Sequence, residues 1–199
     1  MPAASGRSRR AWGWHRLADE WAVRVVAAAA VRPGELVLDI GAGTGALTRP
    51  LIQAGARVVA VELHPGRAAL LRQRFPQITV IQADAVSLRL PGRPFRVVAS
   101  PPYAITADLL DLLLAAGTRL VAADLVLQRA VVRKYAGLPR QPGQPGQAAP
   151  APAAARPPRP HQPHRLYRAY RMSAGLVLPR HAFRPPPRVD SAVLIIRRR

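Results

Sequence analysis

The chain has 199 residues, of which 49% are hydrophobic, so it is long and apolar enough to form one domain with a sizeable core. It contains no cysteine, which excludes disulfide bonds and thiolate metal sites. Lys and Arg number 30 against 10 Asp and Glu, and this charge of +20 indicates binding to a phosphate-bearing polymer such as nucleic acid, with an anionic membrane surface as the alternative.

The basic excess is concentrated toward the C-terminal end. Residues 125–199 hold 15 basic residues and one acid, Asp190, whereas residues 1–124 hold 15 basic and nine acidic residues. We find no stretch with the length of a membrane span or the features of a signal peptide. We therefore expect a cytoplasmic protein that does not associate with membranes.

Taken in chain order, the predicted elements alternate between apolar strands and helices. Residues 1–18 open with the run MPAASGRSRR and are expected to form a basic N-terminal arm, and a helix is predicted to begin at Asp19 as its N-cap. The predicted strands that follow are 35–40, 57–63, 78–84, 95–100 and 120–127, and the predicted helices between them include 65–75 and 106–117, the latter with Thr106 as its cap. This alternation predicts an α/β, Rossmann-like domain whose mostly parallel sheet is covered on both faces.

The alternating pattern ends after Lys134. Residues 137–164 hold nine of the 22 prolines, are rich in Arg, and are expected to be a disordered insertion in a domain spanning 19–199. Two further strands are predicted at 170–179 and 190–199. They complete a mixed sheet of seven strands with one antiparallel strand at its edge.

Glycines and acidic residues follow three of the predicted strands. The segment LDIGAGTGALT (38–48) places Gly41, Gly43 and Gly45 in a turn, but its spacing is neither the dinucleotide nor the phosphate-loop pattern. Glu62 ends the second strand, where a carboxylate can accept both hydroxyls of a ribose, and Asp84 ends the third, where it can accept from an adenine amino group. Together they favour a nucleoside cofactor. The alternatives are structural: Asp39 and Asp84 serve only to hold a loop or a turn.

These features resemble a known family of enzymes. The glycine loop, Glu62, Asp84 and the SPPY corner (100–103) resemble S-adenosylmethionine-dependent methyltransferases that act on the exocyclic nitrogen of adenine. AFRPPPRVDSAVL (182–194) resembles the end of the catalytic domain in rRNA adenine N6-methyltransferases. RSRRAWGWHRLADEWA (7–22) and DLVLQRAVVRKYAG (124–137) resemble their erythromycin-resistance (Erm) branch, in particular a short actinobacterial type.

The resemblance implies a seven-stranded methyltransferase fold with S-adenosyl-L-methionine as cofactor. It further implies a monomer that methylates N6 of an adenine in 23S rRNA, before or during ribosome assembly, and so confers macrolide–lincosamide–streptogramin type resistance. The alternatives are a small-subunit (16S) rRNA adenine dimethyltransferase, a DNA adenine methyltransferase, and a non-catalytic RNA-binding relative. The last is suggested by Ser100, which stands where the family usually has Asn.

The SPPY corner supplies the chemistry that the resemblance implies. The adenine amino nitrogen is a poor nucleophile, because its lone pair is delocalised into the ring, so its N–H bonds need well-placed acceptors. The Ser100 hydroxyl and a carbonyl of the Pro-Pro step that begins at Pro101 are the predicted acceptors, and Ser100 also borders the cofactor. Tyr103 offers a face for stacking an extruded adenine. The structural alternative is that SPPY merely terminates a strand.

Two further sets of residues complete the prediction. By position in the family, His15 and Leu17 are expected to contact the cofactor, although WHRL (14–17) replaces the usual Gln-Asn-Phe-Leu. The family generally carries a C-terminal helical domain that grips RNA, and we expect that domain to be absent here, with no metal site. The predicted phosphate contacts are then arginines of the arm and the tail: Arg7, Arg9, Arg10, Arg197, Arg198 and Arg199. The Arg/Pro-rich insertion (137–164) is expected to add phosphate contacts, with a solvated linker as its alternative.

Overall fold

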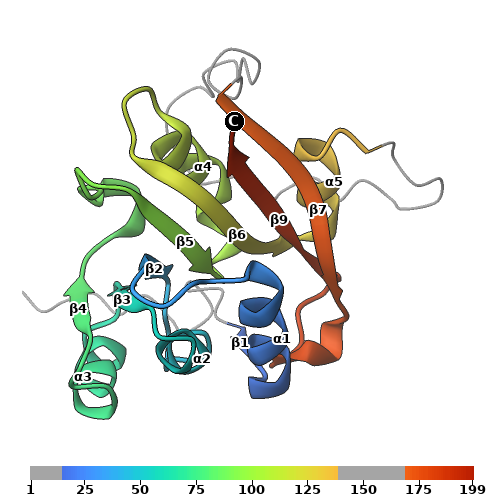
Figure 1. The fold of residues 1–199 in the computed structure, drawn as a ribbon. Helices are drawn as coiled ribbons and strands as arrows, with labels where there is room; N and C mark the ends of the chain where they lie inside the picture. Colours follow the sequence, from blue (N-terminus) through green and yellow to red (C-terminus); the bar gives the residue numbers. More distant parts are fainter. Residues whose placement is uncertain (1–14, 139–168) are drawn as a thin grey trace, which may run out of the picture.

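The computed structural model describes residues 15–138 and 169–199, which form a central seven-stranded sheet flanked by helices (Figure 1). The strands lie in the order β4 (Thr79–Gln82), β3 (Arg57–Glu62), β2 (Leu36–Ile40), β5 (Phe95–Ala99), β6 (Leu120–Gln128), β9 (Ser191–Arg198) and β7 (Tyr170–Leu178). The predicted fold class, a mostly parallel Rossmann-like methyltransferase sheet, is confirmed. One detail was wrong: β9, the antiparallel strand, lies between β6 and β7 and is not at the edge.

Alternating apolar residues in the strands build a core on each face of the sheet. The two faces carry different helices, which are α1 (Asp19–Ala29), α2 (Thr48–Gln53) and α3 (Pro65–Arg74) on one side and α4 (Thr106–Leu114) and α5 (Arg129–Tyr135) on the other. In β5, Val97 packs with α4 while Val98 packs with α1 and α2, as expected for a strand buried on both faces. None of the helices in the described ranges has the length and apolar character needed to cross a membrane.

Two predicted helix starts differ from the structure by one residue. The N-cap of α1 is Ala18, and Asp19 is the first helical residue, where its negative charge favours the helix N-terminus. Thr106 is likewise inside α4, and its hydroxyl donates to the Tyr103 carbonyl instead of capping the helix.

A small second sheet joins the N-terminal segment to the C-terminal part of the domain. Strand β1 (Arg16–Leu17) pairs antiparallel with β8 (Phe183–Arg184), with Leu17 opposite Phe183. Residues 15–18 are therefore part of the folded domain, which corrects the predicted arm of 1–18 at its last residues. This pairing brings His15 and Leu17 to the end of the main sheet where β2, β3 and β5 finish.

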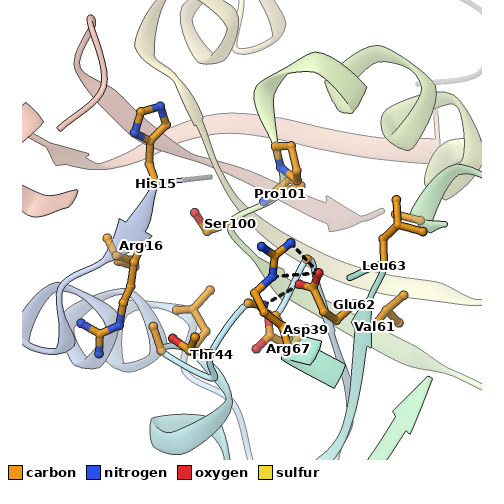
Figure 2. A pocket seen from close by; sticks show the side chains of 18 of the residues that line it. His15, Arg16, Asp39, Thr44, Val61, Glu62, Leu63, Arg67, Ser100 and Pro101 are labelled. Atoms are coloured by element: carbon orange, nitrogen blue, oxygen red, sulfur yellow. Dashed lines mark hydrogen bonds and ion pairs between the residues drawn. The ribbon is translucent and has the colours of Figure 1, made fainter. Parts of the chain in front are cut away.

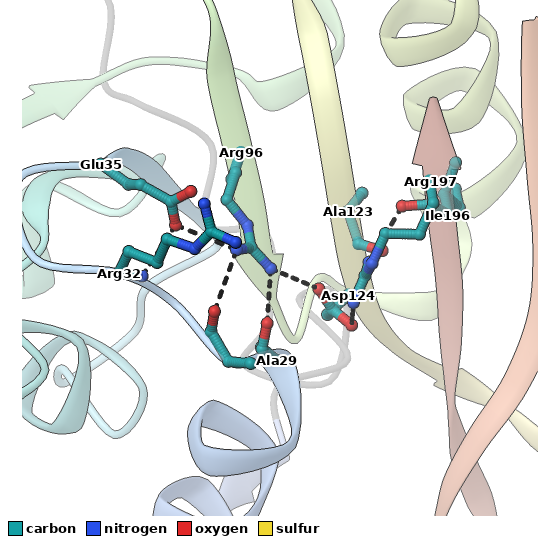
Figure 3. A network of polar contacts seen from close by, with 9 residues as sticks. Ala29, Arg32, Glu35, Arg96, Ala123, Asp124, Ile196 and Arg197 are labelled. Atoms are coloured by element: carbon teal, nitrogen blue, oxygen red, sulfur yellow. Dashed lines mark hydrogen bonds and ion pairs between the residues drawn. The ribbon is translucent and has the colours of Figure 1, made fainter. Parts of the chain in front are cut away.

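A buried arginine ties α1 to the centre of the sheet (Figure 3). Arg96 of β5 donates to the carbonyl oxygens of Ala29 and Ala30 at the C-terminus of α1. The same guanidinium pairs with Glu35 at 2.9 Å and lies 3.6 Å from Asp124 of β6. Since α1 has no basic residue in its last turn, Arg96 supplies the positive charge that its C-terminal carbonyls favour.

Candidate active site

One pocket at the carboxyl end of the parallel strands collects all of the predicted catalytic and cofactor-binding residues (Figure 2). They are His15, Leu17, Gly41, Gly43, Glu62, Asp84, Ser100, Pro101 and Tyr103. They meet because parallel strands in register end at one edge: Ile40 of β2 lies opposite Val61 of β3, and Val61 lies opposite Ile81 of β4. Ligands of such sheets bind at this edge.

The glycine loop after β2 packs directly against the SPPY corner after β5. Gly41 has φ +74°, and a Cβ built on it would lie 3.3 Å from Cδ of Pro102 and 3.4 Å from Cα of Pro101. Gly45 has φ +89°, and its Cβ would lie 2.4 Å from the ring of Phe75. Both positions therefore require glycine, for conformation and for space. The loop and the corner form adjoining walls of the pocket.

Glu62 is a buried carboxylate held from several directions. Its Oε2 accepts from the backbone N–H of Gly43 at 2.9 Å, and its Oε1 accepts from the backbone N–H of His64 at 2.8 Å. The Arg67 guanidinium of α3 donates to Oε1 at 2.8 and 3.1 Å (Figure 2). Within the part of the chain that the structure describes, Oε2 accepts this single hydrogen bond, which leaves it capacity for a ligand hydroxyl. These donors fix the orientation of the Glu62 carboxylate in the pocket.

Arg67 is a pocket residue that the sequence reasoning missed. It is the third residue of α3, in the first turn of the helix, five positions after Glu62. The sequence held one clue: α3 begins three residues after the end of β3, so the first turn of the helix lies close to the end of that strand.

Asp39 is buried beneath the glycine loop, and the Thr48 hydroxyl donates to it at 2.6 Å. Burial raises the pKa of Asp39 to about 7, with the nearby charge of Glu62 adding to the increase and the hydrogen bond from Thr48 opposing it. Asp39 thus holds the loop to α2, as its structural alternative proposed, while also lining the pocket.

Asp84 both holds a turn and lines the pocket, the two roles considered for it from the sequence. Its Oδ1 accepts from the backbone N–H of Val86 at 3.1 Å and caps the short 3₁₀ turn Ala85–Ser87. It also lines the pocket, on the wall formed by the end of β4. The turn therefore fixes the carboxylate at the place where the sequence predicts the adenine of the cofactor.

The SPPY corner begins directly after the last residue of β5, Ala99. Ser100 is half-buried and Pro101 is buried, and both line the pocket (Figure 2). The Tyr103 hydroxyl shares a hydrogen bond of 2.6 Å with the hydroxyl of Ser191 at the start of β9. Burial raises the pKa of the Tyr103 hydroxyl, so it is neutral at physiological pH.

The aromatic ring of Tyr103 faces the imidazole of His15 across the pocket. Their ring centroids are 6.2 Å apart and the planes differ by 27°. His15 donates from Nδ1 to the carbonyl of Pro185 at 2.8 Å, which fixes its tautomer and orientation. Tyr103 is thus anchored through its hydroxyl while its ring remains part of the pocket wall.

Ser191 and Phe183 also belong to the site and were not predicted from spacing. Phe183 lines the pocket, and Ser191 is fully buried beside Tyr103. Ser191 and Tyr103 are 88 positions apart and meet only through the antiparallel return of β9. The sole signal in the sequence was the resemblance of 182–194 to the family.

The predicted phosphate-binding arginines of the tail lie elsewhere. Because β9 is antiparallel, Arg197 to Arg199 lie at the opposite end of the sheet from the pocket. Arg197 pairs with the buried Asp124 at 2.8 Å and donates to the carbonyls of Ala123 and Ile196, so part of its charge is compensated within the protein, and its contact with RNA stays a prediction (Figure 3). Arg198 and Arg199 are exposed. Arg7, Arg9, Arg10 and nearly all of the segment 137–164 lie outside the described residues.

The fold and the pocket define the class, an S-adenosylmethionine-dependent methyltransferase. Residues 7–143 match the family described as ribosomal RNA adenine dimethylase. The chain therefore belongs to the ribosomal RNA adenine dimethylase family. At this level the predictions of an rRNA adenine methyltransferase and of S-adenosyl-L-methionine as its cofactor are confirmed.

Similar proteins come from both branches of the family. The chain is 37% identical over 197 residues to ribosomal RNA small subunit methyltransferase A of Thermosynechococcus vestitus, covering 96% of this chain and 70% of the relative. It is 37% identical over 197 residues to an rRNA methyltransferase of Streptomyces thermotolerans, covering 97% and 60%. The solved 23S rRNA methyltransferase ErmE has a TM-score of 0.73 and 30% identity, over 92% of this chain and 69% of that one.

The lengths of the chains differ. This chain spans 60 to 70% of the length of the small-subunit and Streptomyces relatives that it matches over nearly its whole sequence. A dimethyladenosine transferase of Plasmodium falciparum, at 20% identity and a TM-score of 0.70, shares the fold. Membership of the family and the fold are thus established, and the particular rRNA target is a separate question.

Proposed function

We propose that this chain transfers a methyl group from S-adenosylmethionine to N6 of an adenine in ribosomal RNA. The observation that carries the proposal is the contact of the Gly41 turn with Pro101 and Pro102. Through this contact the nucleoside-binding wall around Glu62 adjoins the corner at Ser100 in one pocket.

The residues that hold the cofactor follow from their positions in the pocket. Glu62 accepts hydrogen bonds from the ribose hydroxyls through its oriented carboxylate, and Asp84 accepts from the adenine amino group. Gly41 and Gly43 allow the backbone to approach the cofactor closely, and His15 and Leu17 border it from β1. The cofactor supplies an electrophilic methyl group.

The residues that prepare the target adenine lie at the SPPY corner. The Ser100 hydroxyl and the Pro101 carbonyl accept from the two N–H bonds of the amino group, which fixes the nitrogen for attack. Tyr103 stacks on the extruded base, with its hydroxyl anchored by Ser191. A strong base is not needed, because the amino group becomes acidic once it is methylated and its proton can then leave.

The rRNA target that we propose is the small-subunit rRNA. Support comes from relatives such as those of Thermosynechococcus vestitus and Leptothrix cholodnii, at 37% and 32% identity, whose names specify the small subunit. The second candidate is 23S rRNA, with macrolide-type resistance as the consequence. It is favoured by the likeness to ErmE, at 30% identity, and by the Erm-like segments 7–22 and 124–137.

Methyl mapping on the two rRNAs separates the candidates. The purified full-length chain is incubated with labelled S-adenosylmethionine and with protein-free 16S or 23S rRNA in separate reactions. Nuclease fragments are then analysed by mass spectrometry. We expect N6-methylated adenosine in 16S rRNA, and label in 23S rRNA alone would transfer the proposal to the resistance branch. Methylation of neither rRNA, by a chain that binds S-adenosylmethionine, would favour the non-catalytic relative.

A further inference from the structure

Exposed arginines line the end of the sheet opposite the pocket. Five of them define what we call the arginine edge: Arg57, Arg93, Arg119, Arg198 and Arg199. Arg57 begins β3, Arg93 and Arg119 precede β5 and β6, and the other two end β9. None of these positions lines the pocket.

The strand register places these residues side by side. Arg57 lies opposite Leu36, the first residue of β2, and Phe95 of β5 lies opposite Leu120 of β6. At the other side, Arg198 lies opposite Tyr170, the first residue of β7. Figure 1 shows the start of β6 and the C-terminal end of β9 at the same end of the sheet. With neighbouring strands about 4.8 Å apart, the row from β3 to β9 extends for roughly 19 Å.

Two carboxylates lie in or directly before these strands near the arginine edge, and both are paired with arginines outside Arg57, Arg93, Arg119, Arg198 and Arg199. Among the described residues, Glu35 binds Arg96 at 2.9 Å, and Asp124 binds Arg197 at 2.8 Å. The positive charge of the arginine edge is therefore not neutralised by the acids of its own strands. The hydrogen bonds described for Arg57 and Arg119 are made by their backbone atoms.

A shallow hollow lies within the arginine edge. It has a volume of about 280 Å³ and is lined by Arg57, Arg93, Arg96, Glu35 and Val121, among others. Arg57 and Arg93 are exposed at its rim, and Val121 presents a 43% exposed apolar side chain. The hollow thus offers exposed cationic groups, which bind phosphate, beside a small apolar surface.

We propose that the arginine edge binds the phosphate backbone of the substrate RNA, at a point remote from the methylated base. A duplex presents one negative charge per roughly 1.7 Å of axis, so a row of this length faces several phosphates. Strands of five to nine residues separate this edge from the pocket by roughly 17–30 Å. A folded rRNA can reach both ends of the sheet. The proposal depends on the proposed function only in taking the substrate to be RNA.

The test compares two triple variants of the full-length chain with equal loss of charge. The edge variant carries Arg57→Gln, Arg93→Gln and Arg119→Gln. The control variant carries Arg24→Gln, Arg49→Gln and Arg72→Gln, three exposed arginines on α1, α2 and α3. Affinity for a labelled RNA duplex of about 24 base pairs is measured by fluorescence anisotropy between about 50 and 200 mM salt. Binding of S-adenosylmethionine is measured by calorimetry.

We expect the edge variant to reduce the slope of log affinity against log salt by about 2 to 3, because each lost phosphate contact removes nearly one unit. The control variant should change the slope by less than about 1, and both should bind S-adenosylmethionine as the wild type does. Equal slopes for the two variants would overturn the proposal. So would loss of binding to phosphatidylserine vesicles by the edge variant with an unchanged RNA slope. A selective effect in a chain that methylates no rRNA would support the arginine edge while refuting the proposed function.

Discussion

Replacing Arg96 with Met tests how the sheet and the first helix are held together. The guanidinium donates to the carbonyls of Ala29 and Ala30 and pairs with Glu35, and its side chain is 11% exposed. Met fills most of the same volume without these polar groups. The substitution leaves the buried Asp124 with Arg197 as its remaining ion-pair partner among the described residues.

The expected cost is large because buried charges lose a partner. Removing one member of a buried ion pair costs about 3–5 kcal/mol, and we expect about 3 kcal/mol here because Arg197 still compensates Asp124. With a urea m-value of about 2–3 kcal/mol per molar, the midpoint of unfolding should fall by about 1–1.5 M. Equilibrium urea unfolding, followed by circular dichroism, measures this change.

A second substitution tests the cause. If an under-compensated Asp124 is responsible, adding Asp124→Asn to Arg96→Met should recover about 1 kcal/mol, whereas Asp124→Asn alone should destabilise the wild type. Arg197 tolerates that change because its side chain is 36% exposed and reaches water. An Arg96→Met variant within about 1 kcal/mol of the wild type would refute the reasoning. Strictly additive effects of the two substitutions would refute it as well.

Three further predictions concern the pocket. Burial raises the pKa of Asp39 to about 7 in the folded protein, so between about pH 4 and pH 7 the folded state holds a proton that the unfolded state has lost. The stability of the wild type should therefore fall by up to about 1.4 kcal/mol per pH unit as the pH rises through this range. Urea unfolding across this range should show a shallower slope for Asp39→Asn, and parallel curves would contradict the assignment. Glu62→Gln should weaken S-adenosylmethionine binding about 10- to 100-fold in calorimetry, because charge-assisted hydrogen bonds to the cofactor are lost. Unchanged affinity would show that Glu62 does not bind the cofactor. Gly45→Ala should lower the free energy of unfolding in urea by about 1–3 kcal/mol, because the new Cβ would clash with Phe75 and the residue has a positive φ. Gly92→Ala is the control, because nothing lies within 4 Å of a Cβ at that position. Equal stability of the two variants would count against this packing.

The pocket was predictable wherever a residue directly follows a parallel strand. Gly41, Glu62, Asp84 and Ser100 lie at or just after the ends of four such strands, and the rule that these ends share one edge was enough to bring them together. No side-chain detail is needed for this step. Strand order and direction determine it.

Contacts that depend on the antiparallel return could not be predicted in the same way. Tyr103 meets Ser191 across 88 positions, because β9 inserts between β6 and β7. The same return pairs Arg197 with Asp124, whereas the sequence analysis assigned Arg197 to RNA in place of the family's C-terminal domain. Composition gives the total charge, but it does not show which arginines have a buried carboxylate as a neighbour. The arginine edge became visible once the register was known.

Methyl transfer at the SPPY corner is tested most directly by single-turnover kinetics with enzyme in excess over rRNA. The product, N6-methylated adenosine, is quantified by mass spectrometry for the wild type, Ser100→Ala and Ser100→Asn. We expect product from the wild type, a rate about 10²- to 10³-fold lower for Ser100→Ala, and a rate at least equal to wild type for Ser100→Asn, since the Asn side-chain carbonyl keeps an acceptor at this position. All three should bind S-adenosylmethionine. A Ser100→Ala rate equal to that of the wild type, or methyl groups found elsewhere than on adenine N6, would contradict the assignment of this corner.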